Sequence, residues 1–314
     1  MQSRLTSIDV FRGVTMAAMV VVNTPGDWGN VYWPLLHAEW HGWTPTDLIF
    51  PFFVFILGVS VTLSRRRSAG AGMIVTRAAI IYGLGLLLAL YPRFDFSTVR
   101  LVGVLARLAF CYLAAALVYR TIARQTVRAR LQTTIGLAAA LLAGYWALLS
   151  FVPAPGGVAG DLSPSGNLGA WIDRTLLGEA HLWSQSRTWD PEGLLSTLPA
   201  IATALTGVAA GVVLTAWQPS DRRARTLLVA GALSTAAGLL WDVSFPINKN
   251  LWTSSYVLFT SGLAAMALAL LHRAVDASDR PPRWTYPFVV MGTNALTLFV
   301  VSGWLVKTLI FIRV

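Results

Sequence analysis

Long apolar stretches follow one another along this chain, separated by short polar segments. Each stretch approaches the roughly 20 residues that a helix needs to cross the hydrocarbon layer of a bilayer. A spanning segment must satisfy its own backbone hydrogen bonds, so we expect every stretch to be a helix. The pattern predicts an all-α, polytopic transmembrane bundle of about nine or more spans. The nine predicted spans are residues 8–24, 47–63, 74–91, 101–119, 131–151, 194–217, 226–243, 253–271 and 286–306.

Composition agrees with this pattern and limits the class of protein. Of the 314 residues, 55% are hydrophobic and 12% are charged, about half the charged share of a soluble domain. The first apolar stretch carries Asp9 and Arg12 and shows no small-residue cleavage site, which favours a permanent helix over a signal peptide. Cys111 is the single cysteine, so no internal disulfide is expected. We interpret residues 1–314 as one transmembrane domain.

The distribution of basic residues predicts the orientation. A net charge of +10 in a soluble protein would suggest nucleic acid, but membrane proteins concentrate Arg and Lys in cytoplasmic loops, and no nucleic-acid partner is expected here. With the N-terminus in the cytoplasm, 15 of the 24 basic residues fall in cytoplasmic segments and seven fall outside. The cytoplasmic set is Arg4, Arg65, Arg66, Arg67, Arg77, Arg120, Arg124, Arg128, Arg130, Arg222, Arg223, Arg225, Arg273, Arg280 and Arg283. The outer set is Arg93, Arg100, Arg174, Arg187, Lys249, Lys307 and Arg313.

Two of the outer segments are unusual. Residues 25–46 and 152–193 are long, and the second is rich in Gly and Pro and contains Trp171, Trp183 and Trp189. Long connections between spans often carry function. The tryptophans are typical of an aromatic belt at the membrane interface, and their flat faces also suit a sugar ring. The two interpretations are compatible.

Histidines in the first outer segment are candidate chemistry. His37 and His41 flank Glu39 in H-A-E-W-H, a spacing that on a helix can hold a metal, but no third ligand is evident and no metal is expected. A neutral imidazole can also act as a general base at neutral pH, or simply be solvated. Asp47, in T-P-T-D, either caps the following helix or orients a histidine; the local sequence leaves both open.

Polar groups within or beside spans are costly and therefore mark candidate sites. Arg107 lies inside a span and requires an anion, an acidic partner or a cluster of carbonyl groups. Asp9 is compatible with a helix cap that pairs with Arg12. Asn23 ends the first span, where it serves either as a helix terminus or as a hydrogen-bond donor.

The second half of the chain adds further polar positions. Asp190 and Glu192, in W-D-P-E-G, predict the start of a helix with Pro in an early position. Asn248 and Lys249 lie in F-P-I-N-K-N-L-W, between the seventh and eighth spans. Asn294 lies inside the last span. The chain has neither a phosphate-binding G-x-x-x-x-G-K-[ST] loop nor a G-x-S-x-G elbow, which argues against an ATP-driven pump.

Seven motifs in order along the chain resemble the heparan-α-glucosaminide N-acetyltransferase family. They cover both halves of the sequence and are specific as a series. They are S-I-D-V-F-R-G (7–13), V-V-N (21–23), L-H-A-E-W-H-G-W-T-P-T-D-L-I-F-P-F-F-V-F-I-L-G (36–58), G-V-L-A-R-L-A-F-C-Y-L (103–113), D-P-E-G-L-L-S-T-L-P-A-I (190–201), F-P-I-N-K-N-L-W-T-S-S-Y-V-L-F-T (245–260) and M-G-T-N-A-L (291–296).

The resemblance implies a membrane acetyltransferase of the bacterial inner membrane. Members of this family take the acetyl group of cytoplasmic acetyl-CoA and place it on an amino sugar across the membrane. The implied catalytic residues are His37, Asn23 and Asp47. The family's span arginine corresponds to Arg107, and we predict that the donor is bound by Arg107, Arg12, Lys249 and Asn248. The implied partners are acetyl-CoA, an amino sugar or glycan and the lipid bilayer, and a homodimer is compatible with the sequence.

The resemblance also leaves alternatives open. The chain is similar to short bacterial members without the large lumenal domain of the animal enzymes, and it stops soon after the ninth span, where relatives continue with further helices. The acetyl group either passes directly to the amine or is first carried by His37 as an acetyl-imidazole. The rival class is an amino-sugar transporter, against which we count the lack of repeat-related broken helices.

Overall fold

The predicted helical bundle is what the structure shows. The computed structural model describes residues 5–27, 29–63, 70–216, 220–277 and 281–312. Within these ranges there is no strand, and nine helices are long and apolar enough to cross a membrane. Six of the basic residues used to predict orientation lie outside the described ranges; they are Arg4, Arg65, Arg66, Arg67, Arg280 and Arg313.

Eight of the nine predicted spans correspond to single long helices. Their bounds are α1 Thr6–Asn23, α2 Ile49–Leu63, α3 Ala71–Leu90, α4 Val104–Ile122, α5 Val127–Phe151, α7 Thr197–Ala216, α8 Ser220–Asp242 and α9 Ser254–Leu271. A 3-10 turn, Pro45–Leu48, precedes α2, and a π-helical turn, His272–Asp276, prolongs α9.

The ninth predicted span, 286–306, is wrong as a single helix. It consists of a short helix, α10 (Tyr286–Thr293), and a longer one, α11 (Ala295–Ile312), separated at Asn294. Asn294 leaves helical geometry, with φ −112° and ψ 22°, and its side-chain amide donates to the carbonyl oxygen of Val290. A side chain that bonds the backbone locally competes with the helical ladder, which explains a break at this residue.

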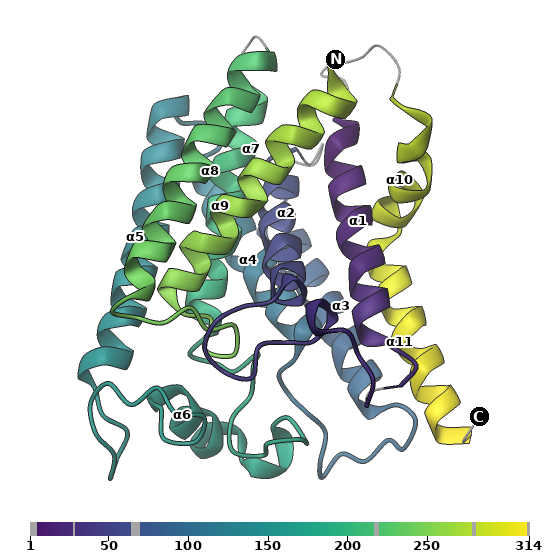
Figure 1. Ribbon diagram of the computed structural model, residues 1–314, viewed down its shortest axis with the longest axis vertical. Coiled ribbons are helices and arrows are strands. Elements are labelled where there is room, and N and C mark those ends of the chain that lie inside the picture. The colour runs from purple at the N-terminus through teal and green to yellow at the C-terminus, as the bar shows by residue number, and fades with distance from the viewer. Residues whose placement is uncertain (1–4, 28, 64–69, 217–219, 278–280, 313–314) are drawn as a thin grey trace.

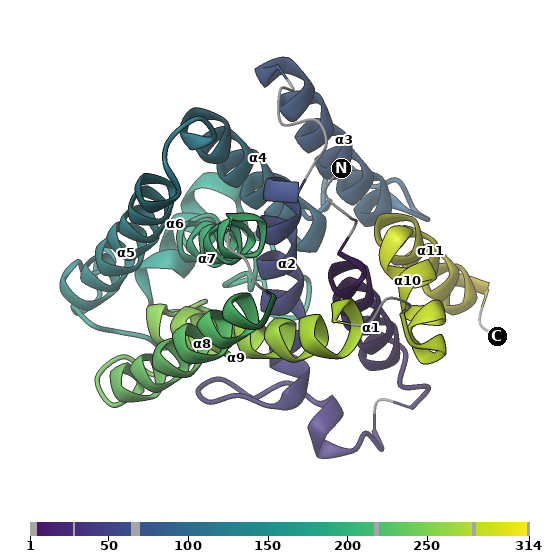
Figure 2. The same cartoon turned by 90° about the horizontal axis from the view of Figure 1, so that it is seen from above.

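The helices divide into a buried centre and an outer ring. Helices α2, α7 and α9 are the most buried, whereas α3, α5, α8 and α11 are largely exposed within the protein. Viewed from above, α2 and α7 lie inside the bundle and α3, α5, α8 and α11 lie around it (Figure 2). The exposed helices are also apolar, with a mean hydropathy of 1.3 to 2.0 against 1.7 to 2.0 for the three most buried helices, as expected of surfaces that face lipid.

Small residues allow the central helices to approach closely. A Cβ atom added at Gly58 of α2 would lie 1.9 Å from the carbonyl oxygen of Ala204 in α7. At the crossing of α1 and α10, a Cβ atom added at Gly13 would lie 1.8 Å from the carbonyl oxygen of Phe288. Small residues at such crossings are typical of helix packing in membranes.

The two ends of the bundle differ in character (Figure 1). One end carries the N-terminus and the short connections; we call it the N-terminal end. The other carries the long segments 24–48, 91–103, 152–196 and 243–253; we call it the loop-rich end. The loop-rich end includes a short amphipathic helix, α6 (Leu168–Leu177), inside the long segment. The prediction that Asp190 and Glu192 start a helix is wrong. The next helix, α7, starts only at Thr197.

Candidate active site at the loop-rich end

Asp47 anchors the candidate site, because one buried carboxylate closes a turn and contacts a histidine. Thr44 begins the turn before α2 and Pro45 occupies its first helical position, where a missing N–H costs nothing. The Oδ2 atom of Asp47 accepts from the backbone N–H groups of Thr44 and Ala38, each at 3.0 Å. Tyr256 of α9 donates its hydroxyl to the backbone oxygen of Asp47. The carboxylate is therefore held in one position.

His37 lies against this carboxylate. Its Nδ1 atom is 2.6 Å from Asp47 Oδ1, and 53% of its side chain is exposed, whereas that of Asp47 is 1% exposed. An ionised carboxylate only accepts hydrogen bonds, so Nδ1 carries the proton and the lone pair is on Nε2. The sequence left two roles open for Asp47, capping of the following helix and orientation of a histidine. The carboxylate has the contacts for both, since it closes the turn and orients the imidazole.

Lys249 reaches the same pair from the segment between α8 and α9. Its Nζ atom lies 2.9 Å and 3.1 Å from the two ring nitrogens of His37 and 3.6 Å from Asp47 Oδ1. Its side chain is only 15% exposed. Burial lowers the pKa of Lys249, and the nearby Asp47 carboxylate opposes that effect. The site thus holds a primary amine beside an imidazole and a carboxylate.

Asn248 shapes the segment that presents Lys249. The residue is fully buried, its Oδ1 accepts from the backbone N–H of Leu251 at 2.8 Å, and its Nδ2 lies 3.4 Å from His41 Nδ1. The backbone N–H of Gly42 also donates to the oxygen of Ile247 at 2.8 Å. The 37–47 and 243–253 segments are therefore joined directly, and His41 takes part in this junction.

Arg107 is buried within the protein and binds carbonyl oxygens. It donates to the backbone oxygens of Pro191 at 2.9 Å and Gly193 at 3.2 Å, and to the hydroxyl of Ser196. Its guanidinium carbon lies 4.9 Å from the centre of the Trp252 ring. Of the partners that the sequence left open for Arg107, these contacts fit a cluster of carbonyl groups. They also hold the 190–196 segment in place.

A second arginine, missed by the sequence analysis, holds the same segment. Arg100 donates two hydrogen bonds to the carboxylate of Asp190 and one to Glu192. Burial of its guanidinium opposes ionisation, but Glu192 and Asp190 raise the pKa of Arg100 above its ordinary value. The acidic pair Asp190 and Glu192 is the feature of the sequence that could have pointed to Arg100, because two buried carboxylates require a cation.

The structure does not bring Arg12 and Asn23 to His37. Arg12 lies in α1 nearer the N-terminal end, where it donates to the oxygens of Gly292 at 3.0 Å and Ser60 at 2.7 Å. Asn23 ends α1 and is exposed, and within the described residues no hydrogen bond links its side chain to His37. A cavity of about 650 Å³ lies at the N-terminal end, lined in part by Asp9 and Arg283.

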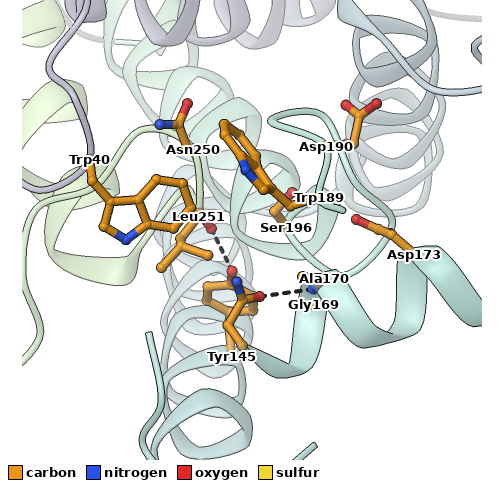
Figure 3. A pocket seen from close by; sticks show the side chains of 11 residues that line it. Trp40, Tyr145, Gly169, Ala170, Asp173, Trp189, Asp190, Ser196, Asn250 and Leu251 are labelled. Carbon is orange, nitrogen blue, oxygen red and sulfur yellow. Dashed lines mark hydrogen bonds between the residues drawn. The ribbon is translucent and has the colours of Figure 1, made fainter. Parts of the chain in front are cut away.

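A small cavity also lies at the loop-rich end (Figure 3). Trp40 and Asn250 line it, and these belong to the same two segments as His37 and Lys249. Trp189 and Asp173 line its other side. No group of three or more His, Cys, Asp and Glu side chains in the described ranges is placed to hold a metal ion.

Comparison with known proteins identifies relatives over most of the chain. Residues 4–157 match the family described as "Heparan-alpha-glucosaminide N-acetyltransferase, catalytic". The chain is 31% identical to heparan-alpha-glucosaminide N-acetyltransferase of Homo sapiens over 95% of its own length and 52% of that protein. For the Mus musculus protein of the same name the identity is 32%, over 95% of this chain and 53% of the relative. The chain thus spans about half the length of the curated relatives it matches.

Proposed function

Because the chain belongs to the family of the heparan-alpha-glucosaminide N-acetyltransferase catalytic domain, we propose that it transfers acetyl groups from acetyl-CoA to an amino sugar across a membrane. The observation that carries the proposal is the hydrogen bond between the exposed imidazole of His37 and the buried carboxylate of Asp47 at the loop-rich end of a membrane bundle. In this proposal the protein lies in a bacterial inner membrane with its N-terminal end in the cytoplasm.

His37 acts as the general base. Much of a sugar amine is protonated at neutral pH and cannot attack a thioester, so a proton must first leave it. The Nε2 lone pair of His37 accepts that proton, and Asp47 stabilises the resulting imidazolium through Nδ1–H. The amine nitrogen then bonds to the acetyl carbon, the carbon–sulfur bond breaks, and the CoA thiolate leaves and takes up a proton.

Lys249 supports this chemistry in two ways. Its Nζ atom lies 2.9 Å and 3.1 Å from the two ring nitrogens of His37 and 3.6 Å from Asp47 Oδ1, so it contacts the pair from a second segment and helps to hold it in place. As a cation next to the site, Lys249 also attracts the carbonyl oxygen of the donor as negative charge develops on it. We propose Asn248 and Arg107 as positioning residues, because each holds a segment of the site from within the protein.

The donor enters from the opposite end of the bundle. The cavity of about 650 Å³ beside Asp9 and Arg283 has the size of a small-molecule site. Arg283 lines this cavity and is our candidate cation for the nucleotide phosphates of acetyl-CoA, and Arg12 lies close by, paired with Asp9 of the lining. The long, thin pantetheine arm then runs along α1 toward His37. Asn23, at the far end of α1, is our candidate hydrogen-bond donor to the thioester oxygen.

The test is acetyl transfer by the purified protein. With acetyl-CoA and glucosamine, we expect N-acetylglucosamine and free CoA to form in equal amounts. His37→Ala should reduce the rate by about 100- to 10,000-fold, the usual contribution of a general base, while acetyl-CoA still binds. His41→Ala is the matched control and should cost much less, because it loses one long contact with Asn248 and leaves the hydrogen bond between His37 and Asp47 in place. A folded His37→Ala protein with near wild-type activity would exclude both the base and the acetyl-imidazole schemes.

One observation favours transport as a second candidate function. The short helix α10 is separated by a break at Asn294 from α11, the ninth helix long enough to span, and broken helices are common at the binding sites of transporters. A transporter would accumulate labelled glucosamine in proteoliposomes without acetyl-CoA. We expect no such uptake; instead, acetyl-CoA supplied on the side of the N-terminal end should yield acetylated sugar on the other side.

A further inference from the structure

The cavity at the loop-rich end lies between three segments. Two of them carry His37 and Lys249, and the third is the long segment before α7. Trp40 and Asn250 come from the His37 and Lys249 segments. Asp173 comes from α6, and Trp189 and Ser196 come from the segment that Arg100 and Arg107 hold. Figure 3 shows the side chains of Trp40 and Trp189 beside the pocket, with Asp173 reaching in from α6. Its lining is therefore fixed by the same contacts that build the candidate active site.

The size of the cavity limits what can enter it. Its volume of about 10 Å³ is that of roughly one water-sized group. A sugar ring does not fit inside, but one hydroxyl group does. Trp40 and Trp189 are only partly buried and meet edge to face, with ring centres 5.0 Å apart. They offer the apolar surface on which a ring can lie over the opening.

Asp173 supplies a carboxylate to the lining of this cavity. It is 3% exposed, and its Oδ1 accepts from the backbone N–H of Leu194 at 2.8 Å. Within the described ranges no hydrogen bond reaches its Oδ2 atom. The oxygens of the neighbouring Asp190, by contrast, accept from Arg100 and from the N–H of Glu192. A hydroxyl group of a ligand that enters the cavity would give this oxygen a hydrogen-bond donor.

We propose that this cavity is the acceptor subsite, in which Asp173 accepts a hydrogen bond from a hydroxyl group of a pyranose whose ring packs on Trp40 and Trp189. The inference rests on the proposed acetyltransferase function. The amine of the sugar must remain near His37, so a hydroxyl group rather than the amine enters the cavity. Of the acceptor classes that the sequence left open, the subsite fits a single amino sugar ring or the terminal ring of a glycan.

Steady-state kinetics with glucosamine tests this subsite. At pH 8, above the pKa of about 7 that burial gives Asp173, loss of a hydrogen bond to its charged carboxylate should raise the acceptor KM of Asp173→Asn about ten- to a hundredfold, with the KM for acetyl-CoA unchanged. Trp189→Ala should also raise the acceptor KM alone. The matched controls are Asp95→Asn and Trp33→Ala, which change an exposed carboxylate and an exposed tryptophan at the same end of the bundle.

Deoxy analogues separate direct contact from a structural effect. With the wild-type protein, one monodeoxy glucosamine should have a raised KM. The increase should equal the one that Asp173→Asn causes with glucosamine itself. The variant should no longer distinguish the two sugars. If every monodeoxy analogue keeps the wild-type KM to within threefold, Asp173 does not hold a hydroxyl group and the proposal is wrong, whether or not the variant folds.

Sugar binding without acetyl-CoA distinguishes this inference from the proposed function. Calorimetry should detect glucosamine binding to the wild-type protein and its loss in Asp173→Asn. If the sugar binds in this way but no acetyl transfer occurs, the subsite stands and the proposed function fails. If transfer occurs while Asp173→Asn and Trp189→Ala keep the wild-type acceptor KM, the proposed function stands and the subsite is elsewhere.

Discussion

At the scale of single residues, Asp47 combines two roles in one carboxylate. It accepts hydrogen bonds from the N–H groups of Ala38 and Thr44, from the Thr44 hydroxyl and from His37. An asparagine keeps one acceptor oxygen and turns an NH₂ group toward donors, so at least one donor loses its partner. The orientation of the imidazole then depends on a weaker neutral group.

We therefore expect Asp47→Asn to lower both activity and stability. The free energy of unfolding should fall by about 1–3 kcal/mol for an unsatisfied buried donor, and kcat should fall by at least about a hundredfold. Thermal unfolding and initial rates measure the two effects. Thr44→Val is the control for the turn alone, since it removes the hydroxyl that contacts Leu36 and Asp47 and keeps the Asp47 carboxylate. A folded Asp47→Asn protein with the wild-type pH–rate profile would contradict the orienting role.

Asp173 predicts a pH dependence of stability with a definite sign. Burial raises the pKa of Asp173 to about 7, the Leu194 N–H opposes this and Asp190 adds to it. Between pH 4 and 7 the folded protein thus keeps a proton that the unfolded chain has lost, so stability falls as pH rises. We expect the melting temperature of Asp173→Asn, relative to wild type, to increase across this range and level off above it.

The control for this prediction is Asp95, whose contribution to stability changes with pH in the opposite direction. Hydrogen bonds from the side chains of Ser97 and Thr98, followed by the Ser97 N–H, lower the pKa of the exposed Asp95. Its stabilising effect is therefore present above pH 4 and lost as pH falls. Relative to wild type, Asp95→Asn should become less stable as pH rises through 4, whereas Asp173→Asn becomes more stable. Parallel changes in both variants would refute the assignment to Asp173.

The sequence could predict some of these residues but not their partners. His37 and Asp47 lie ten residues apart in one motif, so a pairing could be considered from the sequence. The approach of Lys249 and the pairing of Arg100 with Asp190 depend on segments about 200 and 90 residues apart, which meet only after the bundle has folded. Asp173 gave no signal at all, because nothing near it in the sequence shows that α6 is buried against the 190–196 segment.

At the scale of helices, hydropathy predicted spans better than it predicted their ends. Helix α8 begins at Ser220, six residues before the predicted start at 226, because its first turns are the polar sequence S-D-R-R-A-R. The helix α6 was missed because it lies across the end of the bundle and is too short and polar to span. The break at Asn294 was missed because the apolar residues on both sides of Gly292, Thr293 and Asn294 make the whole stretch apolar enough for one span.

Close helix crossings give a prediction at this scale. Gly58→Ala would place a methyl group 1.9 Å from the oxygen of Ala204, so α2 and α7 must separate at the centre of the protein. We expect a clear loss of thermal stability and of folded protein. Gly136→Ala in α5 is the control, since its added Cβ meets nothing within 4 Å and alanine favours a helix by up to about 1 kcal/mol. Equal stability of the two variants would show that α2 and α7 do not cross as described.

At the scale of the whole molecule, the orientation in the membrane decides whether transfer crosses the bilayer. In the described ranges the N-terminal end carries clusters such as Arg120, Arg124 and Arg128, whereas the loop-rich end carries scattered basic residues that are often paired. Even Lys307 of α11 donates to the backbone oxygens of Leu88 and Tyr91. This asymmetry supports a cytoplasmic N-terminal end, with His37 on the opposite side from the cell's acetyl-CoA.

Cysteine labelling in intact cells tests that orientation. Cys111 is fully buried, so only an introduced cysteine should react. A membrane-impermeant maleimide should label Leu176→Cys on α6 and Tyr32→Cys, which are 69% and 81% exposed at the loop-rich end. It should not label Gln125→Cys in the exposed turn before α5, a substitution that leaves the arginine clusters intact. Permeabilised cells should label all three and so establish that each is reactive. If instead only Gln125→Cys reacts in intact cells, His37 faces the cytoplasm, and acetyl transfer would proceed on the cytoplasmic side without carrying the group across the membrane.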